Sequence, residues 1–198
     1  MNNSPQIELH HNDAKQYDWL SKTFHWITAI AVVAAFTLGP SDFGELIQQG
    51  INPGTRNYIV WHESLRLLVF SLTLLRLLWI ALRPETPKFS MAIWMRWSSR
   101  LMHIMLWALL LILPISAILA LASEGHPLTL LGGIQTNDIA FFANSRLSRL
   151  VDWGELHKFI GNVIMWLAGM HAFAAIYHHI LLKDGVLTSM LPSSIRLP

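Results

Sequence analysis

The residues of this chain best suited to chemistry are histidines set in apolar surroundings. Ten of the 198 residues are histidine and none is cysteine. The stretch LHKFIGNVIMWLAGMH places His157 and His171 near the two ends of one apolar segment. On a helix, fourteen residues at about 1.5 Å rise separate the two imidazoles by ~21 Å, and fourteen steps of about 100° return them to within ~40° of one direction. The two rings therefore share a helix face at two depths.

The composition of the chain indicates a membrane protein. Hydrophobic residues make up 53% of it, charged residues 13%, and the mean hydropathy is +0.42. Four apolar segments approach or exceed the length of about 20 residues that a helix needs to cross a hydrocarbon core about 30 Å thick. We therefore predict an all-α fold, a four-helix transmembrane bundle that forms one domain over residues 1–198. The expected helices cover about residues 20–40, 60–82, 101–123 and 156–182.

The distribution of basic residues predicts the orientation of this bundle. Eight Lys and Arg residues fall in the terminal tails and the 83–100 loop, against five on the opposite side. Because cytoplasmic loops carry the excess of Lys and Arg, both termini are expected in the cytoplasm. The net charge of +2 and the lack of a basic cluster interleaved with aromatic residues exclude nucleic acid as a partner. The five outer basic residues are Arg56, Arg66, Arg146, Arg149 and Lys158.

The helix face that carries His157 and His171 also carries small residues. Gly161, Ala168 and Ala172 leave room there for a flat and bulky ligand such as a planar macrocycle. The lack of cysteine excludes iron–sulfur clusters, thiolate metal sites and a haem attached through C-x-x-C-H. Alternatively, small residues only let helices approach closely, and the histidines are buried hydrogen-bonding groups. Ionisable groups inside a membrane usually mark a functional site, which favours the ligand interpretation.

A haem held by two histidines needs one imidazole on each side of the iron. His25 opens the first expected helix at the depth of His171, toward the cytoplasm. His62 opens the second expected helix at the depth of His157, toward the outer face. The spacing therefore predicts an inner pair, His25 with His171, and an outer pair, His62 with His157.

Three further residues are candidates for the inner site. Arg76 follows His62 by fourteen residues, so its guanidinium would reach haem propionates or a quinone oxygen, or would instead snorkel to the interface. His103 competes with His25 for the inner iron, and otherwise lies behind the ligands or in a quinone pocket. His178 keeps the face of His171 ~10 Å nearer the cytoplasm. It would protonate a quinone there, or is an ordinary polar residue of the interface.

Four segments of the chain share a pattern with a known family. They are KTFHW at 22–26, WHESLRLLVFSLTLLRLLWIALRP at 61–84, HIMLWALLLILPISA at 103–117 and LHKFIGNVIMWLAGMHAFAAIYHHILLKDGVLTSMLP at 156–192. Together they resemble the bacterial cytochrome b561 family over all four expected helices. The resemblance implies two non-covalent b-type haems on a four-helix bundle, with ligands at positions that match His25, His62, His157 and His171.

The same resemblance implies a function in the bacterial inner membrane. Family members pass single electrons between a donor at the outer face and the quinone pool, and the best-known small stand-alone member is a superoxide oxidase that reduces ubiquinone. The N-terminal tail and the 124–155 connection look longer than in compact members, so the donor stays open. One alternative is a haem-bearing membrane anchor that links a partner dehydrogenase, such as a hydrogenase or another periplasmic redox protein, to quinone. Another is a helical membrane protein whose histidines are structural.

Overall fold

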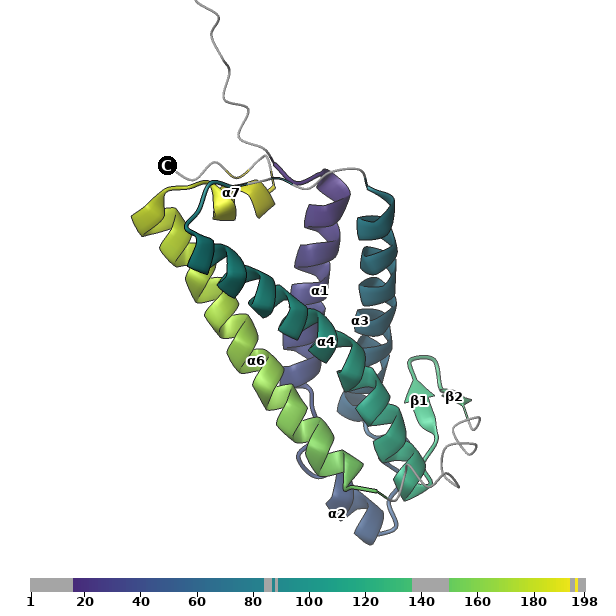
Figure 1. The fold of residues 1–198 in the computed structure, drawn as a ribbon. Helices are drawn as coiled ribbons and strands as arrows, with labels where there is room; N and C mark the ends of the chain where they lie inside the picture. The colour runs from purple at the N-terminus through teal and green to yellow at the C-terminus, as the bar shows by residue number, and fades with distance from the viewer. Residues whose placement is uncertain (1–15, 84–86, 88, 137–149, 193–194, 196–198) are drawn as a thin grey trace, which may run out of the picture.

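The computed structural model describes residues 16–83, 87, 89–136, 150–192 and 195, and every structural statement below concerns these residues. Four long helices dominate the fold (Figure 1). The last of them continues into a π-helical turn, His178–Leu182. The four helices are α1 (Trp19–Thr37), α3 (Asn57–Leu82), α4 (Ile93–Glu124) and α6 (Trp153–Tyr177).

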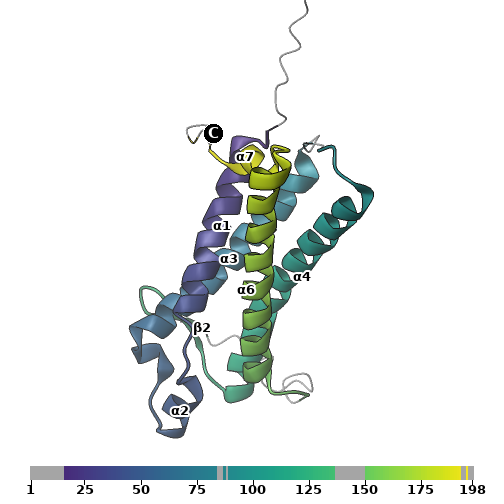
Figure 2. The same cartoon turned by 90° about the vertical axis from the view of Figure 1, so that its left-hand side faces the viewer.

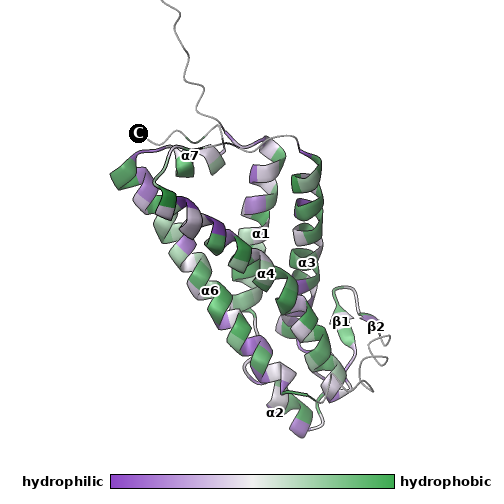
Figure 3. Cartoon of the chain, in the orientation of Figure 1, coloured by the Kyte–Doolittle hydropathy of each residue, from purple (hydrophilic) through white to green (hydrophobic). Residues whose placement is uncertain are grey.

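All four helices are long and apolar enough to cross a membrane. Hydrophobic residues dominate their length (Figure 3), and many large apolar side chains, such as Trp166 and Phe173, face outward. Outward-facing apolar side chains at this density are typical of a lipid-exposed bundle, because lipid tails are as apolar as the side chains themselves. The predicted all-α, four-helix membrane fold is confirmed.

Several helix bounds differ from the predicted ones. Both α3 and α6 begin about three residues earlier than predicted, at Asn57 and Trp153, and two further differences have a physical cause. The third helix begins at Ile93 rather than near residue 101, because Trp94 and Trp97 are exposed at a helix end, where amphipathic rings suit the membrane interface. Polar residues in this segment, such as Arg96 and Arg100, made it read as a loop in the sequence. The first helix ends at Thr37 rather than near residue 40, because Pro40 disfavours helical backbone at the residue before it.

Short elements connect the long helices. A three-residue loop with Gly132 and Gly133 at positive φ joins two antiparallel strands into a hairpin. Glycine adopts positive φ without steric strain because it lacks a Cβ atom, so these two residues permit the tight reversal. The short elements are α2 (Phe43–Gln48), a 3₁₀ turn (Pro53–Thr55), β1 (Leu128–Leu130), β2 (Ile134–Thr136) and α7 (Val186–Met190).

The long helices pack as two pairs, α1 on α3 and α4 on α6, which cross obliquely (Figures 1 and 2). Both ends of the described chain lie at one end of the bundle, where the Tyr17 amide donates to Ser189 O at 3.2 Å and Trp26 Nε1 donates to Met190 O at 2.9 Å. We call this the terminal end. The opposite end carries α2 and the β1–β2 hairpin, and we call it the hairpin end (Figure 1).

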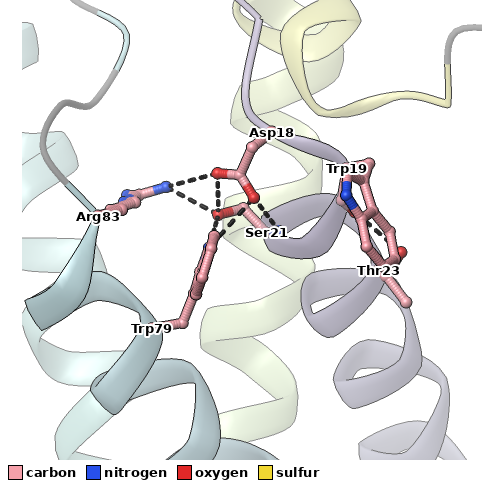
Figure 4. Close-up of polar contacts among 6 residues, drawn as sticks. All are labelled: Asp18, Trp19, Ser21, Thr23, Trp79 and Arg83. Carbon is pink, nitrogen blue, oxygen red and sulfur yellow. Dashed lines mark hydrogen bonds and ion pairs between the residues drawn. The ribbon is translucent and has the colours of Figure 1, made fainter.

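A polar cluster ties α1 to α3 at the terminal end (Figure 4). Asp18 caps α1 by accepting from the Ser21 amide at 2.8 Å, and Trp79 Nε1 of α3 donates to the same carboxylate at 3.1 Å. Arg83, which follows α3, lies 3.6 Å from Asp18 Oδ2 and donates to Ser21 Oγ at 2.8 Å. Burial alone would raise the pKa of Asp18, but the hydrogen bonds from Ser21 and Trp79 and the charge of Arg83 together lower it.

Replacing Asp18 by Asn is expected to destabilise the bundle by about 1 kcal/mol at pH 7, because the cap and the attraction to Arg83 weaken together. The lowered pKa means that the carboxylate stabilises the fold when ionised, so the difference from wild type should shrink as pH falls below 3.8, the ordinary value. Thermal unfolding in detergent at several pH values measures this. Thr37→Ala, which removes only a bond to Ala34 O at the other end of α1, is the control. A difference that stays constant with pH would contradict the assignment.

Candidate functional site

Two histidines face one another at the hairpin end. His62 of α3 and His157 of α6 have ring centroids 6.3 Å apart. The Nδ1 atom of His62 lies 2.6 Å from the carbonyl oxygen of Ala35 in α1. The Nδ1 atom of His157 lies 3.0 Å from Ser116 Oγ and 3.2 Å from the carbonyl oxygen of Leu113, both in α4. All four long helices therefore take part in holding this pair.

These contacts determine which nitrogen of each ring carries the proton. A carbonyl oxygen only accepts, so His62 Nδ1 must donate to Ala35 O. The hydroxyl of Ser116 donates to Leu113 O within its own helix, so its oxygen accepts from His157 Nδ1. In both neutral rings the lone pair is then on Nε2. This tautomer, held by a hydrogen bond from the other nitrogen, is the usual form of a metal-binding histidine.

A cavity of about 720 Å³ adjoins both rings. Its size lies within the range of cofactor and ligand sites. Several small residues line it, and a Cβ atom added at Gly161, one turn after His157, would meet no atom within 4 Å. Small residues of the lining include Ala35, Gly39, Ala117, Ala120 and Gly161.

Three histidines from three helices meet at the terminal end. His25 of α1 and His171 of α6 have ring centroids 6.3 Å apart, the same separation as the pair at the hairpin end. His103 of α4 lies closer to His171, at 5.2 Å, and its Nδ1 is 3.4 Å from Ser99 Oγ. The predicted pairs are therefore brought together in space, and His103 joins the one at the terminal end.

The distances from His171 to His25 and to His103 differ in whether a metal ion fits between the rings. An imidazole nitrogen lies about 2 Å from a bound transition metal and the ring centroid about 1.1 Å further, so two axial imidazoles place their centroids about 6 Å apart. The separation of 6.3 Å between His25 and His171 fits this spacing. The separation of 5.2 Å between His103 and His171 is too short for a metal between facing nitrogens. The geometry thus favours His25 over His103 as the partner of His171.

Each histidine cluster has an arginine from α3 beside it. Arg76 interacts electrostatically with His25, His103 and His171, and its guanidinium carbon lies 4.9 Å from the ring centroid of Trp107 in α4. Its placement at the depth of the terminal cluster agrees with the prediction from its spacing to His62. Arg66 has the same relation to the hairpin end, where it lines the cavity.

His178 lies away from both pairs. Its Nδ1 pairs with the carboxylate of Asp184, which also accepts from the Val186 amide at 3.2 Å. Asp184 therefore contacts the first residue of the π-helical turn, His178, and the first residue of α7, Val186. The structure thus gives His178 an acidic partner that the sequence analysis did not anticipate.

A buried carboxylate joins the β1–β2 hairpin to α3. Glu63 is only 4% exposed, and its Oε2 accepts from the Thr129 amide at 2.6 Å. Ser64 Oγ accepts from the Leu131 amide at 2.9 Å. Glu63 therefore links α3 to the hairpin. Two of the predicted outer cations, Arg146 and Arg149, lie outside the described residues.

Sequence reasoning missed the groups that orient the rings. Ala35 and Leu113 contribute backbone oxygens, which carry no residue-type signal, and Ser116 is one serine among apolar residues. Arg66 had a usable signal, because it follows His62 by four residues and so shares its helix face.

Fold and site together define a helical membrane protein with facing pairs of histidines at both ends of one bundle. Residues 16–193 match the family model described as prokaryotic cytochrome b561. Because the match covers most of the chain, the chain belongs to the prokaryotic cytochrome b561 family. Membership implies b-type haem binding and electron transfer in a membrane.

Curated relatives agree with this assignment. The chain is 28% identical over 191 residues to cytochrome b561 homolog 2 of Escherichia coli, which covers 92% of this chain and 95% of the relative. Cytochrome b561 homolog 1 of the same organism is 29% identical over 175 residues, covering 85% and 92%. A probable superoxide oxidase, CybB of Yersinia pestis, is 30% identical over 189 residues, covering 90% and 97%.

The link between Glu63 and the hairpin leads to a test by amide exchange. Glu63→Ala should speed hydrogen exchange at Thr129 by roughly tenfold, since a hydrogen bond to a charged group contributes about 1.5 kcal/mol or more. Glu63→Gln keeps an acceptor oxygen and serves as the matched control, with a smaller effect expected. Equal exchange in the Ala variant and the wild type would show that the carboxylate does not hold the hairpin.

Proposed function

We propose that the chain binds two b-type haems, and that it carries electrons from superoxide at the hairpin end to ubiquinone at the terminal end. His62 and His157 hold one haem, and His25 and His171 hold the other. The observation that carries the proposal is the equal separation of 6.3 Å in the two histidine pairs, which α6 shares. That separation is the one expected for two axial imidazoles.

The hairpin end fits a haem in three independent respects. The cavity beside the rings has about 720 Å³, its small lining residues leave a broad space, and both rings present Nε2 as the free nitrogen. A purely structural histidine needs none of these features. When bound, haem iron supplies one-electron chemistry, while the protein sets its position and environment.

The arrangement of ligands determines the mode of transfer. Each haem would be held by two histidines, and iron held in this way would exchange electrons by outer-sphere transfer and not by binding oxygen. His157 and His171 lie ~21 Å apart along α6. The helix therefore holds one redox site near each face of the membrane, and the two sites together span it.

The proposed reaction balances with two superoxide anions for each quinone. Each superoxide gives up one electron and becomes molecular oxygen, and ubiquinone takes two electrons and two protons to become ubiquinol. A relative named as a probable superoxide oxidase supports superoxide as the donor. Arg76, His103 and the His178–Asp184 pair supply the polar groups around the terminal end, where we place quinone and the entry of its protons.

The membrane orientation follows from the distribution of basic residues. We place the terminal end in the cytoplasm and the hairpin end on the outer side of the bacterial inner membrane. Electrons then move inward across the membrane, from a donor outside to quinone at the inner leaflet.

The ligand assignment is tested by haem content. Each of the variants His25→Ala, His62→Ala, His157→Ala and His171→Ala should retain about one of two haems per chain, because each removes one of the two imidazoles that would hold a haem. Pyridine haemochrome quantitation and reduced-minus-oxidised spectra of purified protein measure this. Two matched controls, His103→Ala and His179→Ala, should keep both haems. Full haem content in all four ligand variants would refute the assignment.

The donor is tested in protein reconstituted with ubiquinone. Superoxide pulses should yield one quinol for every two superoxide anions consumed, and His62→Ala should slow this reaction by about tenfold or more. Superoxide dismutase added with the pulse should abolish it. A haem-loaded protein that ignores superoxide, yet takes electrons from a co-purified soluble redox subunit, would identify a membrane anchor instead.

A further inference from the structure

Arg66 is the one basic side chain in the described part of the chain that adjoins the hairpin-end cavity without a polar partner of its own. It follows His62 by one helical turn and lines the cavity between His62 and His157. Its Nε atom is enclosed and has no hydrogen-bond partner among the described residues. Enclosing part of a charged group without a partner is costly, so the Nε atom calls for a partner such as a water molecule, an ion or a ligand.

The nearest acidic residue does not satisfy this guanidinium. Glu63 attracts Arg66 electrostatically, but its Oε2 accepts from the Thr129 amide, and no ion pair with Arg66 forms within 4.0 Å in the described structure. Arg66 also interacts electrostatically with His62 and His157, whose rings are neutral. The carboxylates of Glu124, Asp152 and Glu155 line the same cavity, and none of them forms an ion pair with Arg66 in the described structure. The guanidinium is thus attracted toward Glu63 but lacks an anionic oxygen in contact.

A second cation, Lys158, lines the same cavity but differs from Arg66 in its exposure and in its acidic partner. Lys158 is 53% exposed along its side chain and pairs with Glu155 at 2.8 Å. It therefore has an acidic partner and access to water. Of the two cations, Arg66 is the one that a ligand in the cavity would complete.

The chemistry of a guanidinium indicates the class of that ligand. Its planar fork of N–H donors matches a carboxylate, and the pair is strongest where water is excluded. A b-type haem is an apolar macrocycle that carries carboxylates only on its two propionates. We propose that Arg66 binds a propionate of the haem held by His62 and His157, and that its charge raises the midpoint potential of that haem. This inference rests on the proposed function.

The direction of the potential shift follows from charge. Reduction lowers the positive charge on the iron, so a cation nearby favours the reduced form, and neutralising a propionate acts in the same direction. Removing the cation should therefore lower the potential of the haem at the hairpin end. The haem between His25 and His171 should change little, because it would lie ~21 Å further along α6.

The test is a potentiometric titration of Arg66→Gln in the His25→Ala background, where only the haem at the hairpin end remains. We expect the midpoint potential to fall by 59 mV or more, which corresponds to a tenfold change in the one-electron equilibrium. Arg56→Gln is the matched control, because Arg56 is an exposed cation just before α3 and does not line the cavity. It should leave the potential unchanged. An unchanged potential in Arg66→Gln would overturn the inference.

A second variant keeps the inference falsifiable if Arg66→Gln does not accumulate. Arg66→Lys retains the charge but loses the planar fork, so haem transfer from the protein to apomyoglobin should speed up about tenfold relative to wild type. Transfer as slow as in wild type would overturn the inference.

The outcomes also separate this inference from the proposed function. If His25→Ala keeps both haems, the ligand assignment fails before Arg66 is examined. If one haem is lost and Arg66→Gln slows the reaction with superoxide without moving the potential, the guanidinium serves the substrate anion, and the propionate assignment is wrong.

Discussion

The spacing of two imidazoles on one helix governs this structure. His157 and His171 lie on one face of α6, and each meets a histidine of another helix at a centroid separation of 6.3 Å. Because α6 takes part in both pairs, its helical geometry fixes the distance between the two sites at ~21 Å along its axis. The other helices must then bring a partner ring to each depth. His25 near the start of α1 and His62 near the start of α3 do so from opposite ends of the bundle.

The four helices could be predicted because apolar length fixes the number of membrane crossings. The two pairs of facing rings could be predicted because a fourteen-residue interval places two histidines on one helix face. What orients the rings could not be predicted. The acceptors of His62 and His157 are Ala35 O, Leu113 O and Ser116 Oγ, which lie 27, 44 and 41 residues away along the chain. Backbone oxygens look alike in every sequence, so only the packed structure shows which one a ring meets.

The choice between His25 and His103 shows where sequence reasoning ends for a different reason. Both residues stand near the start of a helix at the terminal end, so depth alone cannot separate them. The distance between ring centroids favours His25, since 6.3 Å matches the spacing of two imidazoles around a metal and 5.2 Å is shorter than that spacing. Residue spacing along a chain measures depth well. It measures lateral distance between helices poorly, because crossing angles and side-chain rotamers decide it.

The position of the charged residue Arg76 on α3 follows the same helical spacing as the two histidines of α6. His62 and Arg76 lie fourteen residues apart on α3, the same interval that separates His157 and His171 on α6. His62, at the depth of His157, and Arg76, at the depth of His171, therefore lie on one face of α3. In a membrane an unpaired charge is costly, so arginines at such depths usually pair with another group or face a cavity. Trp107 meets Arg76 from α4, whereas the described structure leaves Arg66 facing a cavity. That asymmetry is the observation behind the proposed contact between Arg66 and a haem propionate at the hairpin end.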